Sequence, residues 1–453
     1  MNLPSAHLES LRKSLGNEFD QFALAYNEAP PVSIRINKGK WQGETPSDHV
    51  AWSEDGYYLK ERPSFTHDPK FHAGWYYVQE ASSQFLSHIA KNVFPKDHSL
   101  KVLDLCAAPG GKSTLLASEL SDDDLLVSNE VIRTRAHILA ENISKWGKPN
   151  VVVTNNDPEQ FQKLKGFFDV IVVDAPCSGE GLFRRDPELT SEWSEENVNL
   201  CSARQRRIVL DIWDSLKEGG ILVYSTCTFN AQENEENLTW LKSQISFESV
   251  ELNVPKDWDI VESPEPLNTK PETIHGYRFY PHKVKGEGFF VSVLLKTDAS
   301  EQTGGKEKLL FTPAPAKERN EVSSWLKNPE QFDFIRRGDH VLAVPKIHVE
   351  SVHKLSRLLN CVQYGIPVAD AQKGLKPLHE LSQSIQLNTS AFHVTELSKD
   401  EALKFLAKED FKVNDSHKGI ALMMHDGAAL GWMNLLGNRA NNLYPKEWRI
   451  RRL

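Results

Sequence analysis

The chain has 453 residues, more than one compact core usually holds, so we expect two or three domains. Hydrophobic residues make up 40% and charged residues 25%, which is typical of a folded globular protein and excludes fibrous and wholly disordered classes. The 53 Lys and Arg against 62 Asp and Glu give a net charge of -9, which argues against a uniformly basic surface but does not exclude local basic patches.

The sequence predicts a cytoplasmic protein without a membrane span, a disulfide framework or a metal. No segment approaches the roughly 20 apolar residues that a membrane-spanning helix needs, and the N-terminus lacks the apolar core of a signal peptide. The five cysteines are too scattered for a disulfide framework, and no two form the C-x-x-C pair of a structural zinc site. His72 and His282 have no partners at the spacing of metal ligands.

Residues 1 to 95 are interpreted as an accessory region of mixed helices and short strands. Within it, PPVSIRINKGK at residues 30 to 40 is typical of an exposed basic strand. Trp75, Tyr76 and Tyr77 form an aromatic cluster beside a helix, which is more often part of a hydrophobic core than a surface that stacks on nucleic-acid bases.

Residues 96 to 297 alternate between β-branched runs and helical stretches, a pattern typical of a parallel sheet covered on both faces. The runs predict strands at residues 101 to 106, 124 to 130, 150 to 157, 168 to 176 and 219 to 227. Helices are predicted at 112 to 121 and 134 to 147, and a closing hairpin at 276 to 282 and 288 to 296. We therefore expect an α/β Rossmann-like domain with a mixed, mostly parallel sheet that binds ligands at the carboxyl ends of its strands.

Three further segments follow this domain. Residues 298 to 308 are polar and patternless, as in a linker. Residues 309 to 390 form an intermediate region without a motif of its own, and residues 391 to 453 form a last unit. The stretch from Gly437 is basic although the whole chain is acidic: against a single acid it holds Arg439, Lys446, Arg449, Arg451 and Arg452.

A glycine-rich turn follows the first strand of the sheet, in VLDLCAAPGGKST at residues 102 to 114. Such a turn brings the backbone close to a ligand at a helix N-terminus. A Walker A loop is excluded because the glycine that it needs five positions before Gly111 is Cys106 in this chain. The G-x-G-x-x-G pattern of dinucleotide-binding proteins is also absent.

Three carboxylates, Glu130, Asp157 and Asp174, follow consecutive strands. Each alone is more often a helix cap or a solvated loop residue, but three at one edge of a sheet indicate a shared ligand. Glu130 lies about 20 residues after the glycines, where a carboxylate accepts both ribose hydroxyls. Because an acidic rim repels pyrophosphate and attracts a positively charged group beside a nucleoside, it favours S-adenosylmethionine over NAD.

Cys177 and Cys227 lie in the loops after the fourth and fifth strands, over the same edge. A lone buried cysteine is usually a small hydrophobic residue, but two beside Asp174 favour a reactive role. Carbon 5 of cytosine attacks a methylsulfonium only after a thiolate has added at carbon 6. A carboxyl group at ring nitrogen 3 and the exocyclic amine stabilises that adduct, and Asp174 is placed for this role.

The segments LDLCAAPGGKS, VVDAPCSGEGLFRRDP and YSTCTFNAQENEE resemble the motifs of the RNA cytosine carbon-5 methyltransferases of the NOL1/NOP2/Sun family. HAGWYYVQEASSQ, at residues 72 to 84, is similar to the segment that precedes the catalytic sheet of that family. The resemblance covers residues 30 to 296. It implies methylation of cytosine in RNA, with S-adenosylmethionine as the methyl donor.

The resemblance also implies a role for each matching residue. Cys227 is the nucleophile, Cys177 helps to release the product, and Asp174 orients the base and borders the cofactor site. Glu130 and Asp157 bind the nucleoside of the cofactor. The cofactor loop consists of Cys106, Ala107, Ala108, Pro109, Gly110, Gly111 and Lys112. DNA cytosine methyltransferases attack instead from a Pro-Cys cysteine, so the residues alone leave the two thiol roles interchangeable.

The C-terminal stretch GWMNLLGNRANNLYPKEWRIRR resembles the PUA-like RNA-binding domain of the bacterial ribosomal-RNA branch of this family. We therefore expect a monomer that acts on ribosomal RNA or the small ribosomal subunit, and on neither DNA nor a membrane. Arg35 and Lys38 in the accessory region and the basic tail are candidates for binding the RNA backbone. A transfer-RNA methyltransferase with the same chemistry and a non-catalytic RNA-binding factor for ribosome assembly remain as alternatives.

Two residue pairs beside these motifs have open or structural interpretations. Arg184 and Arg185 either contact phosphates or form a solvated basic loop. Asn230 and Glu233 have the spacing of a helix-capping box, with Asn in place of Ser or Thr. This second pair therefore predicts the start of a helix and not a catalytic role.

Overall fold

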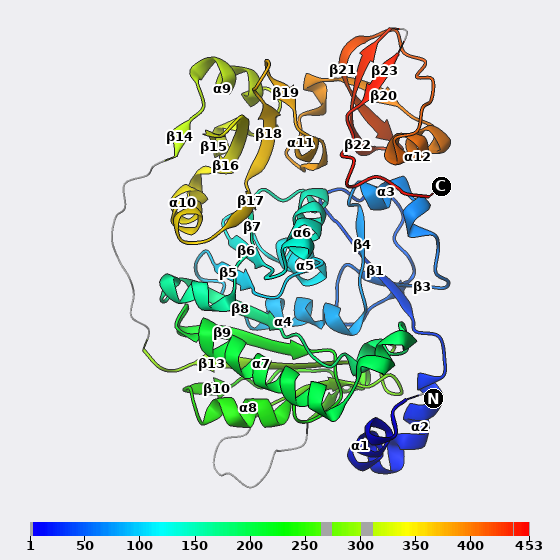
Figure 1. Cartoon of the computed structure of the whole chain (residues 1–453), viewed down its shortest axis with the longest axis vertical. Helices are drawn as coiled ribbons and strands as arrows, with labels where there is room; N and C mark the ends of the chain where they lie inside the picture. Colours follow the sequence, from blue (N-terminus) through cyan, green and yellow to red (C-terminus); the bar gives the residue numbers. More distant parts are fainter. Residues whose placement is uncertain (1–2, 264–273, 300–310, 438, 453) are drawn as a thin grey trace.

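The computed structural model describes residues 3–263, 274–299, 311–437 and 439–452 (Figure 1). Its largest sheet has the strand order β11-β12-β13-β9-β8-β5-β6-β7-β17, with β10 paired to β13. Its five parallel strands are β5 (Lys101–Asp104), β6 (Leu125–Asn129), β7 (Val151–Thr154), β8 (Phe168–Asp174) and β9 (Leu216–Thr226). The predicted mixed, Rossmann-like sheet is confirmed, but only its central five strands are parallel; the prediction that it is mostly parallel is wrong, because antiparallel strands extend it at both ends.

Helices cover both faces of this sheet. On one face lie α4 (Leu86–Asn92), α5 (Gly111–Glu119) and α6 (Arg133–Trp146). On the other face lie α7 (Glu195–Trp213), α8 (Glu235–Lys242) and α10 (Val349–Leu358). Gly147 ends α6 in the left-handed conformation, at the boundary that the sequence predicts.

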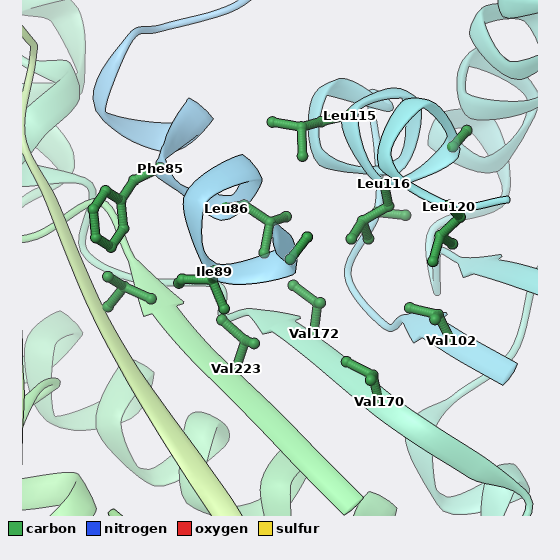
Figure 2. Close-up of a cluster of buried hydrophobic side chains, with 14 of the residues drawn as sticks. Phe85, Leu86, Ile89, Val102, Leu115, Leu116, Leu120, Val170, Val172 and Val223 are labelled. Atoms are coloured by element: carbon green, nitrogen blue, oxygen red, sulfur yellow. The ribbon is translucent and has the colours of Figure 1, made fainter. Parts of the chain in front are cut away.

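The β-branched residues of the parallel strands supply two hydrophobic cores, because successive side chains of a strand point to opposite faces. Val170 and Val172 belong to the core with Ile89 and Leu116, as Figure 2 shows. Ile171, between them, belongs to the other core. Complete burial of one such side chain contributes about 1.5 to 3 kcal/mol. Because apolar residues point to both faces, they stabilise the packing of helices on each side of the sheet.

Antiparallel strands close one end of the large sheet. They are β10 (Phe247–Ser249), β11 (Val261–Glu262), β12 (Tyr277–Phe279) and β13 (Phe289–Lys296). β12 and β13 form the predicted hairpin, and β13 pairs with β9. The connections contain the 3-10 helices η4 (Pro158–Leu164), η5 (Glu180–Leu182), η6 (Pro187–Glu192) and η7 (Lys256–Trp258).

The N-terminal unit combines helices with a four-stranded antiparallel sheet of order β2-β3-β1-β4. The strands are β1 (Val32–Ile36), β2 (Asp48–His49), β3 (Gly56–Leu59) and β4 (Tyr76–Val78). The helical segments are α1 (Ser5–Leu15), η1 (Gly16–Glu18), α2 (Phe19–Tyr26), η2 (Phe65–His67), α3 (Pro69–His72) and η3 (Ser82–Phe85).

The prediction that residues 30 to 40 form an exposed basic strand is wrong. Arg35 in β1 is 1% exposed, and its guanidinium lies 4.5 Å from the ring centroid of Trp146. It also donates to Gln79 Oε1 (3.0 Å) and Thr114 Oγ1 (2.6 Å), which offsets the cost of burying the charge. β1 therefore joins the N-terminal unit to α5 and α6 and offers no arginine to RNA.

The region after the large domain contains two more sheets. The first, in the order β14-β15-β16-β18-β19, consists of β14 (Thr312–Pro313), β15 (Phe332–Arg337), β16 (His340–Pro345), β18 (Ile366–Asp370) and β19 (Lys376–Pro377). Its helical segments are α9 (Ala316–Ser323), η8 (Pro329–Gln331), η9 (Lys346–His348) and α11 (His379–Gln383). β17 (Cys361–Tyr364) leaves this unit and pairs antiparallel with β7, so it extends the large sheet.

The last unit is a four-stranded sheet at the top right of Figure 1. It contains η10 (Thr389–Ala391), β20 (His393–Glu396), α12 (Lys399–Ala407), β21 (Lys418–His425), β22 (Ala428–Leu436) and β23 (Ala440–Asn442). Residues 300 to 308 of the predicted linker lie outside the described residues. Among the helices that the structure does describe, none has the length and apolar character to cross a membrane.

Candidate active site

The candidate site lies where the parallel strands end. β5, β6, β8 and β9 finish at one edge of the sheet, so side chains from motifs far apart in the sequence meet there. Lys112 Nζ is 2.8 Å from Asp174 Oδ2. Cys177 Sγ is 3.1 Å from Cys227 Sγ. The glycine turn, the acid after β8 and the two predicted thiols are thus neighbours in space.

The glycine turn after β5 has the shape of a ligand-binding loop. Gly110 has a φ of 119°, which a side chain would strain, and α5 begins at the next residue without a side-chain cap. The carbonyl of Ala108 accepts from Arg135 Nη2 and that of Pro109 from Asn142 Nδ2, both at 2.8 Å, which hold the turn against α6. Uncapped N–H groups at a helix N-terminus suit the carboxylate of an amino-acid ligand.

Asp104, at the end of β5, is a candidate binding residue that the sequence analysis missed. Its side chain is buried, and Oδ2 accepts from Ser113 Oγ at 2.6 Å, whereas Oδ1 has no hydrogen-bond partner in the described part of the chain. Burial raises the pKa of Asp104 to about 7. A buried, half-satisfied carboxyl beside the turn suits a ligand with an amino group. The sequence feature that could have indicated this residue is its position as the one acid between the apolar strand and the glycine turn.

Cys106 and Ala107, which begin the predicted cofactor loop, are partly and completely buried. Burial raises the pKa of the Cys106 thiol, so this cysteine stays protonated and is not a nucleophile. Cys106 therefore contributes to the shape of the cofactor loop and not to the chemistry of Cys177 and Cys227.

The two other predicted carboxylates differ in how they are held. Glu130 is buried after β6; its Oε1 accepts from the backbone N–H of Ile132 at 2.8 Å, and Oε2 lies 3.5 Å from Arg135 Nη1. Asp157 is 41% exposed and caps η4 by accepting from the N–H of Glu159 at 3.2 Å. Glu130 lies beside the glycine turn, whereas Asp157 makes the helix-cap contact that the sequence left as its alternative role.

Lys112 connects the cofactor loop to the acid after β8. Although burial opposes its charge, the ion pair with Asp174 raises the pKa of Lys112, so Lys112 stays positively charged. The other oxygen of Asp174 accepts from Ser225 Oγ at 2.9 Å. Asp174 is thus oriented from both sides, and a third of its side chain remains exposed to a ligand.

Cys177 and Cys227 are both free, and their sulfur atoms are in contact. The hydrogen bond with Cys227, together with burial, raises the pKa of Cys177 well above its ordinary value. Cys177 is therefore a protonated thiol that can donate to the sulfur of Cys227. This asymmetry favours Cys227 as the nucleophile of the pair.

Glu180 fixes the loop that carries Cys227. It is 1% exposed and accepts from the backbone N–H groups of Phe229 (2.8 Å) and Asn230 (3.0 Å) and from Trp193 Nε1 (3.0 Å). Burial alone would raise the pKa of Glu180, but hydrogen bonds from His7 and other donors lower it to about 2. Its partners come from three separate segments, so no local sequence pattern indicates this role.

Glu233 holds the loop that carries Cys177 through hydrogen bonds, as Glu180 holds the loop of Cys227. It accepts from the N–H of Ser178 (3.0 Å), from Gln205 Nε2 (2.7 Å) and from Asn230 Nδ2 (2.7 Å). The N–H of Glu233 does donate to Asn230 Oδ1, but α8 begins only at Glu235. The predicted capping box is therefore wrong, because the Glu233 side chain crosses to the neighbouring loop.

Three more of the predicted residues make structural contacts. Trp75 and Tyr76 are buried, which confirms the core interpretation. Arg184 donates to the carbonyls of Gly286, Glu28 and Ala29. Within the described ranges, no group of three or more His, Cys, Asp or Glu side chains is arranged to hold a metal ion.

Comparisons with known families match three parts of the chain. Residues 91–295 match the family described as 16S rRNA methyltransferase RsmB/F. Residues 3–81 match the N-terminal domain of 16S rRNA methyltransferase RsmF, and residues 392–450 match the methyltransferase RsmF PUA domain.

Relatives along the whole chain agree with this assignment. The ribosomal RNA small subunit methyltransferase F of Shewanella loihica is 31% identical over 91% of this chain and 85% of its own length. That of Aliivibrio fischeri is 31% identical over 98% of this chain and 97% of its own. The crystal structure of a methyltransferase homolog protein from Pyrococcus horikoshii is 28% identical, covers 65% of this chain and all of its own, and has a TM-score of 0.51. The chain therefore belongs to the 16S rRNA methyltransferase RsmB/F family and is an S-adenosylmethionine-dependent RNA methyltransferase.

Proposed function

We propose that the protein methylates carbon 5 of a cytosine in the RNA of the small ribosomal subunit, through a covalent bond between Cys227 and the base. The observation that carries this proposal is the contact of two free thiols beside Asp174, whose side chain is paired with Lys112. A single cysteine in such a loop can be present only for packing. Two cysteines in contact, one of them a protonated thiol, indicate a nucleophile with a proton donor beside it.

The residues divide the chemistry among them. Cys227 adds as a thiolate to carbon 6, while the carboxyl group of Asp174 donates a hydrogen bond to ring nitrogen 3 and accepts one from the exocyclic amine. This pair of hydrogen bonds stabilises the negative charge of the adduct and leaves electron density on carbon 5. S-adenosylmethionine supplies the methyl group as an electrophile. The proton on carbon 5 then passes to solvent, and the electrons of its C–H bond expel Cys227 as the ring regains its aromaticity. Cys177 assists this step by donating its S–H to the departing sulfur.

The residues at the glycine turn fit the methyl donor. The uncapped start of α5 suits its carboxylate, Asp104 Oδ1 suits its amino group, and Glu130 is placed for the ribose hydroxyls. We assign Asp157 a smaller part in binding the nucleoside of the donor, because its carboxylate also caps η4. Lys112 holds the side chain of Asp174 at the boundary between donor and base.

The relatives and the C-terminal unit support ribosomal RNA as the substrate. The relatives are named for the small subunit, and the five Arg and Lys side chains of the basic tail are exposed on a unit that matches a PUA domain. We further propose that the protein acts as a monomer in the cytoplasm, on RNA and not on DNA.

The proposal is tested by incubating the purified protein with small subunits, free ribosomal RNA and transfer RNA from a strain that lacks it. Nucleoside mass spectrometry should detect new 5-methylcytosine in the ribosomal RNA. Cys227→Ala should abolish it, whereas Cys201→Ala, at a buried cysteine in α7, should not. Methylation of transfer RNA alone, or none by the native protein, contradicts the proposal.

A further inference from the structure

A cleft of about 940 Å³ opens between the N-terminal unit and the catalytic domain, and the chemistry above uses none of it. One wall consists of residues 28–32 and 59–62 of the N-terminal unit. The opposite wall consists of Arg184 and Arg185 after β8 and of residues 284–287 before β13.

A wall of the cleft continues into a segment that packs against the loop of Cys227. Gly181 N–H donates to the carbonyl of Cys227 at 2.9 Å. A Cβ on Gly181 would lie 3.0 Å from that carbonyl and 2.9 Å from the carbonyl of Gly288, so only a glycine fits between them. Glu287, which lines the cleft, directly precedes Gly288. The cleft is therefore connected through the backbone at Gly288 and Gly181 to the loop that carries the reacting thiol.

Two buried side chains of the cleft have unused hydrogen-bonding capacity. Glu287 is 5% exposed and its Oε2 has no hydrogen-bond partner among the described residues; Arg185 Nη1 lies 3.4 Å away. Burial and the neighbouring Glu80 raise the pKa of Glu287 to about 7. Arg184 Nε is buried and likewise lacks a hydrogen-bond partner in the described part. Native structures rarely leave such groups unsatisfied unless a ligand or water completes them.

The charges at the cleft suit a nucleotide. Lys60, Arg62 and Arg185 are exposed at its rim, where they can bind phosphate. Of the acids that line the cleft, Asp48 is paired with Lys285 at 2.6 Å, and Glu28 and Glu61 are exposed. Cations thus lie at the opening on both walls, and the wall of the catalytic domain adds a carboxyl group and an arginine Nε inside.

We propose that this cleft binds the nucleotide that flanks the target cytosine, with its phosphate on Arg185 and Arg62 and its base edge on Glu287. This inference rests on the proposed function, because it requires an RNA strand with its target base at Cys227. Guanine presents two adjacent N–H donors that match the two oxygens of a carboxylate, so we assign guanine as the preferred flanking base. When Arg185 turns to the phosphate, Glu287 Oε2 becomes available to the base.

The test uses small subunits whose ribosomal RNA carries each of the four bases on either side of the methylated cytosine. The native protein should prefer guanine on one side by about 10-fold in kcat/KM, the size expected for one bidentate contact. Glu287→Gln should reduce that preference to less than about 3-fold and leave the kcat/KM for the other bases unchanged. Glu61→Gln, at an exposed acid of the same cleft, is the matched control and should keep the native preference.

The two proposals fail in different ways. If the native protein methylates no cytosine, the proposed function fails. If the native protein and Glu287→Gln both methylate with the same flanking-base profile, or if the native profile is flat, only the nucleotide cleft is refuted. Arg185→Ala gives a second readout: a lower salt slope of RNA binding supports phosphate contact, and an unchanged slope contradicts it.

Discussion

Replacement of Glu180 should loosen the loop that carries the nucleophile. Glu180→Gln keeps the shape of the side chain but replaces one acceptor oxygen with an amide that faces N–H donors, among them Phe229 and Asn230. A buried carboxyl whose pKa falls from 4.5 to about 2 gains on the order of 3 kcal/mol from contacts of its ionised form. At neutral pH this stabilisation is present in full, because the unfolded carboxyl is also ionised there.

The assay is hydrogen exchange of the amides at positions 229 and 230. A loss of about 3 kcal/mol in the local opening free energy accelerates their exchange on the order of 100-fold. Since the folded pKa lies below the unfolded one, the difference from the native protein should shrink as pH falls from 4.5 towards 2. Methylation should fall as well, because displacement of a nucleophile by 1 Å costs about 100-fold in rate.

Glu188→Gln is the matched control, because Glu188 is exposed on the same loop. It should leave exchange at residues 229 and 230 at the native rate. If Glu180→Gln also leaves it unchanged at pH 7, the loop is held by other contacts and the role assigned to Glu180 is refuted.

Three more predictions concern the cofactor, the N-terminal unit and the tail. Asp104→Asn should weaken S-adenosylmethionine binding about 10-fold in titration calorimetry, because it removes a charged partner of the amino group; unchanged affinity contradicts that contact. Arg35→Met should destabilise the protein by about 2 to 4 kcal/mol in urea unfolding through lost hydrogen bonds and packing on the tryptophan, without a change in the salt slope of RNA binding. Replacing Arg449, Arg451 and Arg452 together with Ala should lower that salt slope by about 2 if each binds a phosphate of single-stranded RNA, and a native slope would rule the tail out.

The sequence placed the candidate residues together because they follow one geometric rule. Asp174 ends β8, Cys177 lies in the loop after it, and Cys227 directly follows β9, so recognising the strands was enough to place them at one edge. The buried runs of Val and Ile made these strands clear, and the hairpin of β12 and β13 followed from the same pattern.

The sequence failed where a side chain depends on a distant partner. Arg35 alternates with apolar residues as an exposed strand residue would, and only the approach of α5 and α6 shows that it is buried. Glu233 has the spacing of a cap but binds the N–H of Ser178, 55 residues earlier. β17 likewise pairs with β7 across some 200 residues, and no local pattern of the region from 309 to 390 indicates this.

The central claim is that Cys227 forms the bond to the base and that Cys177 assists its cleavage. The most direct measurement is mass spectrometry of the protein-RNA adduct formed by the native protein, Cys227→Ala and Cys177→Ala in the presence of the methyl donor. The account predicts that the adduct accumulates with Cys177→Ala, maps to residue 227 and is absent from Cys227→Ala. An adduct that survives in Cys227→Ala and disappears in Cys177→Ala would reverse the two roles and contradict the account.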